Sequence, residues 1–371
     1  MLIILFVISF SMLNKSMSLE NKLFNNNLLI NKNKPIVYIP GLGGSVIYDI
    51  NNNEIWPPNL YSIVTNNFQK KISITNNLEP IYKTNSALLF NNNKNGDDTN
   101  GIKIINKNTK YFISNRFGEY ILEYFYKKLY PVYAIPYDFR IIPQINYLKS
   151  LRESIKLSIE EIYKKKNKKV VVIAHSLGSI VIMNFFNNID NKWINKYIDL
   201  VICINPPFEG SILALRTLLE SSLNFFFKNI KLNFIRNFGG LIWCLPDINH
   251  NTDFLNIDGK DITNIENVLY PETLEIYKKY FKNNDNYDKK KINKNLNLHI
   301  IKSYGINTPI KLYLNSSQYG YKFNKYDYMD GDGIIINNIN TNNFNIHRIV
   351  GEHSNILESN DLLNKINEII K

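Results

Sequence analysis

The sequence is poor in cysteine, and this scarcity limits the kinds of protein that it can encode. Only Cys203 and Cys244 occur among 371 residues, so no disulfide framework is implied. Cys203 lies within an apolar run, which predicts an inert thiol in the core. Cysteine and histidine nowhere have the spacing of a metal site. We therefore expect neither a metal nor a cofactor.

Acidic residues are scarce relative to basic ones: 32 Asp and Glu stand against 44 Lys and Arg, a net charge of +12. Such an excess would suit nucleic acid or anionic membranes. The lysines are scattered, however, and their densest group, at 164–169, closes an amphipathic helical pattern over 146–166. Cations are favourable at a helix C-terminus, so we expect solvated lysines there and no nucleic-acid partner.

The apolar stretch at the N-terminus is too short to span a bilayer comfortably. Residues 1–10 have the length of a signal-peptide core, and Ser16 and Ser18 lie near a plausible cleavage point. We expect a signal peptide over residues 1–18 and a protein of the secretory pathway, secreted or in a membrane-bound compartment and peripheral to the membrane. The lack of Lys and Arg before the apolar core leaves an uncleaved anchor as the alternative.

What the sequence does contain is a β-branched run that stops at a serine. Residues 170–174 read VVVIA, and His-Ser-Leu-Gly and the apolar pattern of a packed helix follow. A strand that turns sharply into a helix around a serine is a nucleophile elbow, G-x-S-x-G, with Ala174 here in place of the first glycine. The pattern predicts Ser176 as a nucleophile at the top of a sheet. The alternative is a chance serine in an ordinary strand-turn-helix unit.

A nucleophilic serine needs a base, which on such a fold follows it after an acidic residue. The sequence has five histidines, and His353 suits this role best because it lies in a polar turn before a final helical segment over 356–370. His347 is the alternative, although its strand-like surroundings favour a strand or surface position.

The orienting carboxylate is expected in the segment Asp-Gly-Asp-Gly. Glycines on both sides of Asp332 permit a tight turn, whereas Asp330 is better explained as a turn or capping residue. A calcium loop would need glutamate at its twelfth position. A loop that starts at Asp330 has Thr341 there, and one that starts at Asp327 has Asn338. The sequence therefore favours Asp332 as the acid.

A glycine-rich loop follows the early strand predicted at 35–40 and suits an oxyanion hole. Its glycines let the backbone bend until the N–H of Leu42 points at a substrate carbonyl oxygen. The N–H of Leu177, at the start of the elbow helix, would be the second donor. The loop lacks the spacing of a dinucleotide fingerprint or of a P-loop, which argues against nucleotide binding.

Seven segments together resemble the lecithin:cholesterol acyltransferase family, which includes lysosomal phospholipase A and the phospholipid:diacylglycerol acyltransferases. They occur in the family order and span about residues 33–371. They are PIVYIPGLGGS (35–45), PYDFR (136–140), AHSLGS (174–179), VICINPPFEGS (201–211), YGINTP (304–309), DGDG (330–333) and EHSNIL (352–357). The chain departs from the family pattern at Phe139 and Phe208, and it lacks the lid disulfide of animal members.

The resemblance implies the α/β class: an α/β-hydrolase with a mostly parallel sheet flanked by helices. It also implies that Ser176 attacks a glycerophospholipid ester, that Asp332 and His353 complete the triad, and that Leu42 and Leu177 give the oxyanion N–H groups. The implied partners are a phospholipid and membrane surface, with an alcohol or sterol as acyl acceptor.

Two stretches of the domain at 33–371 do not fit a core pattern. About 54–110 reads as a lid, in which Trp56 and then Leu60, Ile63 and Val64, at helix-like spacing among polar residues, are expected to contact lipid. The alternative is a small helix packed against the core. About 211–295 reads as a cap inserted before the acid and base.

The resulting interpretation is a secreted serine phospholipase or O-acyltransferase that forms an acyl-enzyme on Ser176. A neutral-lipid or sterol-ester esterase and a catalytically inactive lipid-binding protein are the alternatives. Beside a core strand predicted at 132–136, Asp138 and Arg140 are expected to form an ion pair, because charges this close to a sheet are seldom left unpaired.

Overall fold

The computed structural model describes residues 33–49, 51, 53–56, 67–80, 84–86, 118–221, 233–246, 253–282, 288, 291–318, 320–336 and 344–371. The predicted signal peptide at 1–18 and three residues of the expected lipid contact, Leu60, Ile63 and Val64, lie outside these ranges. Within them, no helix combines the length and the apolar character needed to span a membrane.

A six-stranded parallel sheet forms the centre of the fold, in the order β13-β10-β7-β6-β1-β5. Three of its inner strands, β1, β6 and β7, are mostly apolar because helices cover both faces of the sheet. The predicted α/β class is confirmed. The strands are β1 (Ile36–Ile39), β5 (Val132–Ala134), β6 (Val170–His175), β7 (Ile198–Ile204), β10 (Leu298–Tyr304) and β13 (Asn345–Val350).

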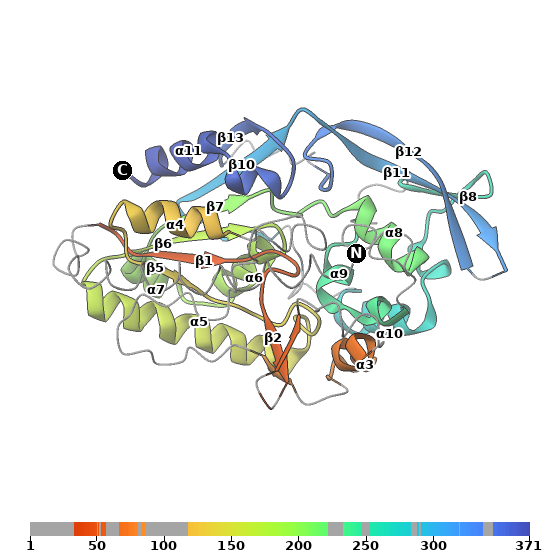
Figure 1. Ribbon diagram of the computed structural model, residues 1–371, viewed down its shortest axis with the longest axis horizontal. Coiled ribbons are helices and arrows are strands. Elements are labelled where there is room, and N and C mark those ends of the chain that lie inside the picture. The colour runs from red at the N-terminus through yellow and green to blue at the C-terminus, as the bar shows by residue number, and fades with distance from the viewer. Residues whose placement is uncertain are drawn as a thin grey trace, which may run out of the picture.

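Two apolar clusters lie on opposite faces of this sheet. Alternate residues of β1 show this division: Ile36 and Tyr38 belong to one cluster, Val37 and Ile39 to the other. Figure 1 shows α4 and α11 along one face and α5, α6 and α7 along the other. These helices are α4 (Glu119–Lys127), α5 (Ile145–Lys166), α6 (Leu177–Phe186), α7 (Asn191–Tyr197) and α11 (Asn360–Ile370), the last preceded by η6 (Asn355–Glu358).

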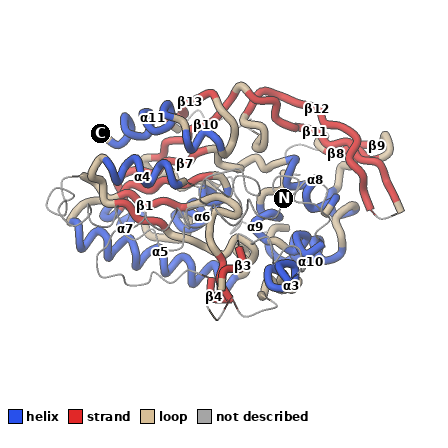
Figure 2. Tube along the Cα trace, viewed as in Figure 1, coloured by secondary structure: helices blue, strands red, loops and turns tan. Residues whose placement is uncertain are grey.

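A second group of elements lies beyond one end of the sheet, at the right of Figures 1 and 2. Its four strands have the order β12-β11-β8-β9, and α8 packs against β11 and β12. The elements are α8 (Ile212–Glu220), η3 (Asn233–Asn237), α9 (Gly239–Trp243), β8 (Leu255–Ile257), β9 (Lys260–Asp261), η4 (Ile265–Asn267), α10 (Pro271–Tyr280), β11 (Ile306–Ser317) and β12 (Gly320–Gly331). The division into core, lid and cap stays a prediction.

A small sheet, β3-β2-β4, and the helix α3 (Asn67–Ile72) follow the first strand of the core. Its strands are β2 (Ile47–Asp49), β3 (Glu54–Trp56) and β4 (Thr84–Ser86).

The expected contact of Trp56 with lipid is wrong, because its side chain lies in the core. Trp56 is 2% exposed, and its ring packs against Phe68 at 6.1 Å and Phe139 at 5.6 Å between centroids. The indole Nε1–H donates to the Gly43 carbonyl at 2.7 Å. A tryptophan favours a membrane interface when its N–H needs water, and here the protein supplies both the apolar surroundings and the acceptor.

Candidate active site

The sharp turn between β6 and α6 lifts one serine above the carboxyl edge of the sheet. Ser176 has φ 51° and ψ −128°, a conformation that is rare for a residue with a side chain and that marks functional turns. The turn also needs Gly178, because a Cβ there would lie 2.4 Å from the Pro40 carbonyl oxygen. Helix α6 can therefore approach the end of β1 closely.

Three side chains from distant segments form a hydrogen-bonded relay at this turn. The Nε2 atom of His353 lies 2.9 Å from the hydroxyl of Ser176, and its Nδ1 atom lies 2.7 Å from Oδ2 of Asp332. All three are buried, at 8% exposure or less. An ionised carboxylate only accepts, so the ring proton sits on Nδ1 and leaves Nε2 free to accept from the serine.

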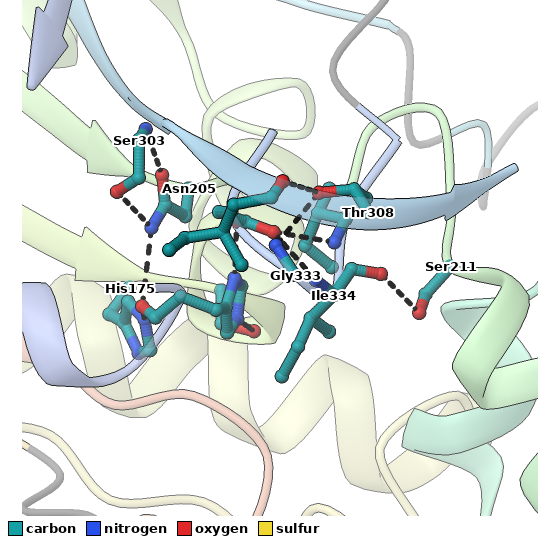
Figure 3. A network of polar contacts seen from close by, with 12 residues as sticks. His175, Asn205, Ser211, Ser303, Thr308, Gly333 and Ile334 are labelled. Atoms are coloured by element: carbon teal, nitrogen blue, oxygen red, sulfur yellow. Dashed lines mark hydrogen bonds and ion pairs between the residues drawn. The ribbon is translucent and has the colours of Figure 1, made fainter. Parts of the chain in front are cut away.

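The backbone around Asp332 fixes its carboxylate. Oδ1 accepts from the N–H groups of Ile334 at 2.8 Å and Ile335 at 2.7 Å, which leaves Oδ2 for the histidine. Figure 3 shows this turn bound on two sides: Gly333 N–H donates to the hydroxyl of Thr308, and the hydroxyl of Ser211 donates to the Ile334 carbonyl, both at 2.7 Å.

The glycine-rich loop lies directly against the serine. A Cβ on Gly41 would be 2.9 Å from Cβ of Ser176, so only glycine allows this approach. A turn closed by Gly44 N–H and the Gly41 carbonyl at 3.0 Å carries Leu42. Leu177 opens α6, where the first N–H groups have no partner within the helix and bear partial positive charge. Both leucines therefore adjoin residues that lie at the serine, and their role as oxyanion donors stays a prediction.

The alternative acid and base lie in other surroundings. His347 is on β13, where its Nε2 atom lies 3.0 Å from Nδ1 of His299 on the neighbouring strand. Asp330 lies on β12 rather than in a turn of its own, and its carboxylate accepts from Gly305 N–H at 2.7 Å, between β10 and β11. The structure thus brings Ser176, Asp332 and His353 together and leaves these two residues outside the relay.

The predicted pair of Asp138 and Arg140 is confirmed as a buried ion pair. Arg140 donates through Nε at 2.9 Å and Nη2 at 2.6 Å to the two oxygens of the carboxylate. Its Nη1 donates to the carbonyl of Ile72, the last residue of α3. The pair therefore joins the loop after β5 to the segment predicted as lid.

Two polar residues at the site were not assigned from the sequence, His175 and Asn205. Both are buried, and both contact the backbone of His353. Only the position of Asn205 at the carboxyl end of a core strand, beside the elbow strand, gives a signal in the sequence. Within the described ranges, no group of three or more His, Cys, Asp or Glu side chains could hold a metal ion.

Comparison with known proteins identifies relatives of this chain. Lysosomal phospholipase A and acyltransferase of Bos taurus is 32% identical over 108 residues, which cover 29% of this chain and 26% of that protein. Phosphatidylcholine-sterol acyltransferase of Mus musculus is 37% identical over 89 residues, which cover 24% of this chain and 19% of that protein. These alignments therefore span about a quarter or less of the curated relatives.

A solved structure of a Bacillus licheniformis lipase in its mature form is 13% identical, has a TM-score of 0.36, and covers 91% of this chain and 92% of that one. A family model described as lecithin:cholesterol acyltransferase matches residues 100–353, more than half of the chain. The matched segment includes the serine, the aspartate and the histidine of the relay. The chain belongs to the lecithin:cholesterol acyltransferase family.

Proposed function

We propose that this protein is a serine-dependent phospholipase or O-acyltransferase that acts on the acyl esters of glycerophospholipids at a membrane surface. The observation that carries the proposal is the relay from Ser176 through His353 to Asp332, with donor–acceptor distances of 2.9 and 2.7 Å. The names of the family and of its relatives support the lipid substrate. A location in the secretory pathway, which the predicted signal peptide would give, fits the lysosomal location in the name of one relative.

The first half of the reaction would acylate the serine. The Ser176 oxygen attacks the ester carbonyl while Nε2 of His353 takes its proton, and Asp332 stabilises the resulting imidazolium. The N–H groups of Leu42 and Leu177 would receive the negative oxygen of the tetrahedral intermediate. When this intermediate collapses, the imidazolium returns its proton to the departing lysophospholipid oxygen, and the acyl group stays on the serine.

The second half would release the acyl group to an acceptor. His353 removes a proton from water, which then attacks the acyl-enzyme and yields a fatty acid. An alcohol or sterol in the same position would yield a new ester, because the chemistry of attack is identical. What enters the site therefore decides between hydrolase and acyltransferase.

A fluorophosphonate probe tests the nucleophile. We expect covalent labelling at Ser176, identified by peptide mass, and none in a Ser176→Ala variant. Labelled phosphatidylcholine vesicles, with and without added alcohol or sterol, then test the substrate through the fatty acid and ester formed. A wild-type protein that is neither labelled nor active on phospholipid would exclude the proposal and favour a lipid-binding protein. Labelling with cleavage of neutral-lipid esters alone would favour an esterase.

A further inference from the structure

The backbone of His353, the proposed base, is held by hydrogen bonds, as its side chain is. His353 lies in a turn between β13 and η6, and its own N–H donates to the Asp332 carbonyl at 2.8 Å. Its carbonyl oxygen accepts from Nε2 of His175 at 3.0 Å and from Nδ2 of Asn205 at 3.2 Å. The peptide groups on both sides of the Cα atom are therefore fixed, and with them the direction of its Cα–Cβ bond.

The orientation of the Asn205 amide follows from its other partners. Oδ1 accepts from the N–H of Ser303 at 2.7 Å, and Nδ2 donates to the Ser303 hydroxyl at 2.8 Å (Figure 3). Only the amide nitrogen can then donate to His353. Asn205 also has φ 46°, in the left-handed region that asparagine tolerates better than most residues. The position thus calls for a short side chain with both a donor and an acceptor.

The tautomer of His175 follows in the same way. A carbonyl oxygen only accepts, so the proton of a neutral ring must sit on Nε2. The Nδ1 atom is then a buried acceptor, and it has no hydrogen-bond partner among the described residues. Such an acceptor costs stability, so stability alone does not account for a histidine here.

Burial also keeps this ring neutral. Burial, and then the neighbouring His353, lower the pKa of His175 from its ordinary 6.5 to about 3. The two rings lie 5.0 Å apart between centroids, so a charged His175 would oppose the imidazolium that forms on the base during the reaction.

We propose that His175 and Asn205 are positioning residues for His353. Both donate to its backbone carbonyl, and through it they hold the imidazole within reach of Ser176 and Asp332. This inference rests on the proposed function, since it assigns a role within the same triad. Neither residue is a proton donor to the substrate.

The test compares two replacements of one ring. His175→Phe keeps a flat ring and removes the donor, and we expect kcat for a soluble short-chain ester to fall about 10- to 100-fold, with KM within about twofold. His175→Gln places an amide N–H near the old Nε2 position, and we expect it to restore most of kcat. Asn205→Asp, which sets an acceptor against the carbonyl, should lower kcat as well.

His299→Phe is the matched control, because His299 bonds to His347 away from the triad, and we expect its kcat to equal that of the wild type. Melting temperatures separate folding from positioning. If His175→Gln restores the melting temperature but not kcat, or if His175→Phe keeps full kcat, the inference is overturned while the proposed function stands. A wild type that the fluorophosphonate probe fails to label overturns both.

Discussion

At the scale of single residues, the triad should behave as one unit. Ser176→Ala, Asp332→Asn and His353→Ala should each remove most ester cleavage without unfolding the protein, since each breaks the same relay. Because such effects are not additive, the Ser176→Ala/His353→Ala variant should be hardly slower than either single variant. Rates of short-chain ester cleavage, with melting temperatures as a folding control, measure this. Full activity in His353→Ala together with loss in His347→Ala would identify His347 as the base.

His175 should make the protein sensitive to acid. Its pKa is about 3 in the folded protein against about 6.5 when unfolded, so between these values only the unfolded chain binds the proton. Stability from this residue is therefore complete above about pH 6.5 and declines as the pH falls toward 3. Between pH 7 and 4.5 the loss is about 2–3 kcal/mol.

The measurement is the free energy of unfolding at both pH values for the wild type and His175→Gln. Glutamine does not titrate, and the carboxylates common to both proteins cancel in the comparison. The variant should therefore lose less stability on acidification. Parallel losses in the two proteins would mean that the unfolded and folded chains bind this proton alike.

At the scale of elements, Arg140 joins three parts of the chain. Its side chain pairs with Asp138 and binds the end of α3, and its backbone carbonyl accepts from Gly239 N–H at 2.6 Å, at the start of α9. Arg140→Gln leaves a buried carboxylate without its cation, which should cost about 3–5 kcal/mol of the free energy of unfolding. Lys127→Gln, from an exposed pair with Glu123, is the control and should cost at most about 1 kcal/mol. An unchanged melting temperature with lost turnover would indicate a direct role in catalysis.

The core elements could be predicted from the sequence because each carries its own signal. The run that became β1 is apolar throughout, those of β6 and β7 are apolar except for His175 and Asp199, and the stripe of α5 is regular. The long hairpin of β11 and β12 was not predicted. Its residues alternate irregularly between buried and exposed, and β11 pairs with β8, whose paired residues lie 57 positions earlier in the chain. Tertiary contacts therefore decide its structure.

The same difference between local signals and tertiary contacts explains which site residues could be predicted from the sequence. Ser176, Asp332 and His353 sit in glycine-rich or polar turns that stand out in the sequence. His175 and Asn205 gain their proposed role only from contact with His353, across 178 and 148 residues of sequence. The contact of Trp56 was mispredicted for a similar reason, because its hydrogen-bond acceptor, Gly43, and one of its aromatic neighbours, Phe139, lie outside the predicted lid.

At the scale of the whole molecule, the burial of Trp56 changes what its replacement should do. Trp56→Ser removes a core ring that contacts Phe68 and Phe139, and it leaves the Gly43 carbonyl without its donor. We expect a loss of about 3–5 kcal/mol in the free energy of unfolding. Cleavage of vesicle phospholipid and of a soluble short-chain ester should fall by the same factor, because the defect lies in the fold on which cleavage of both substrates depends.

Trp56→Phe, which keeps a ring and loses only the N–H, is the control and should lie between Trp56→Ser and the wild type on every measure. If vesicle cleavage alone falls while the soluble ester is cleaved at the wild-type rate, Trp56 contacts the membrane in the working enzyme, and the core position must open at the lipid surface.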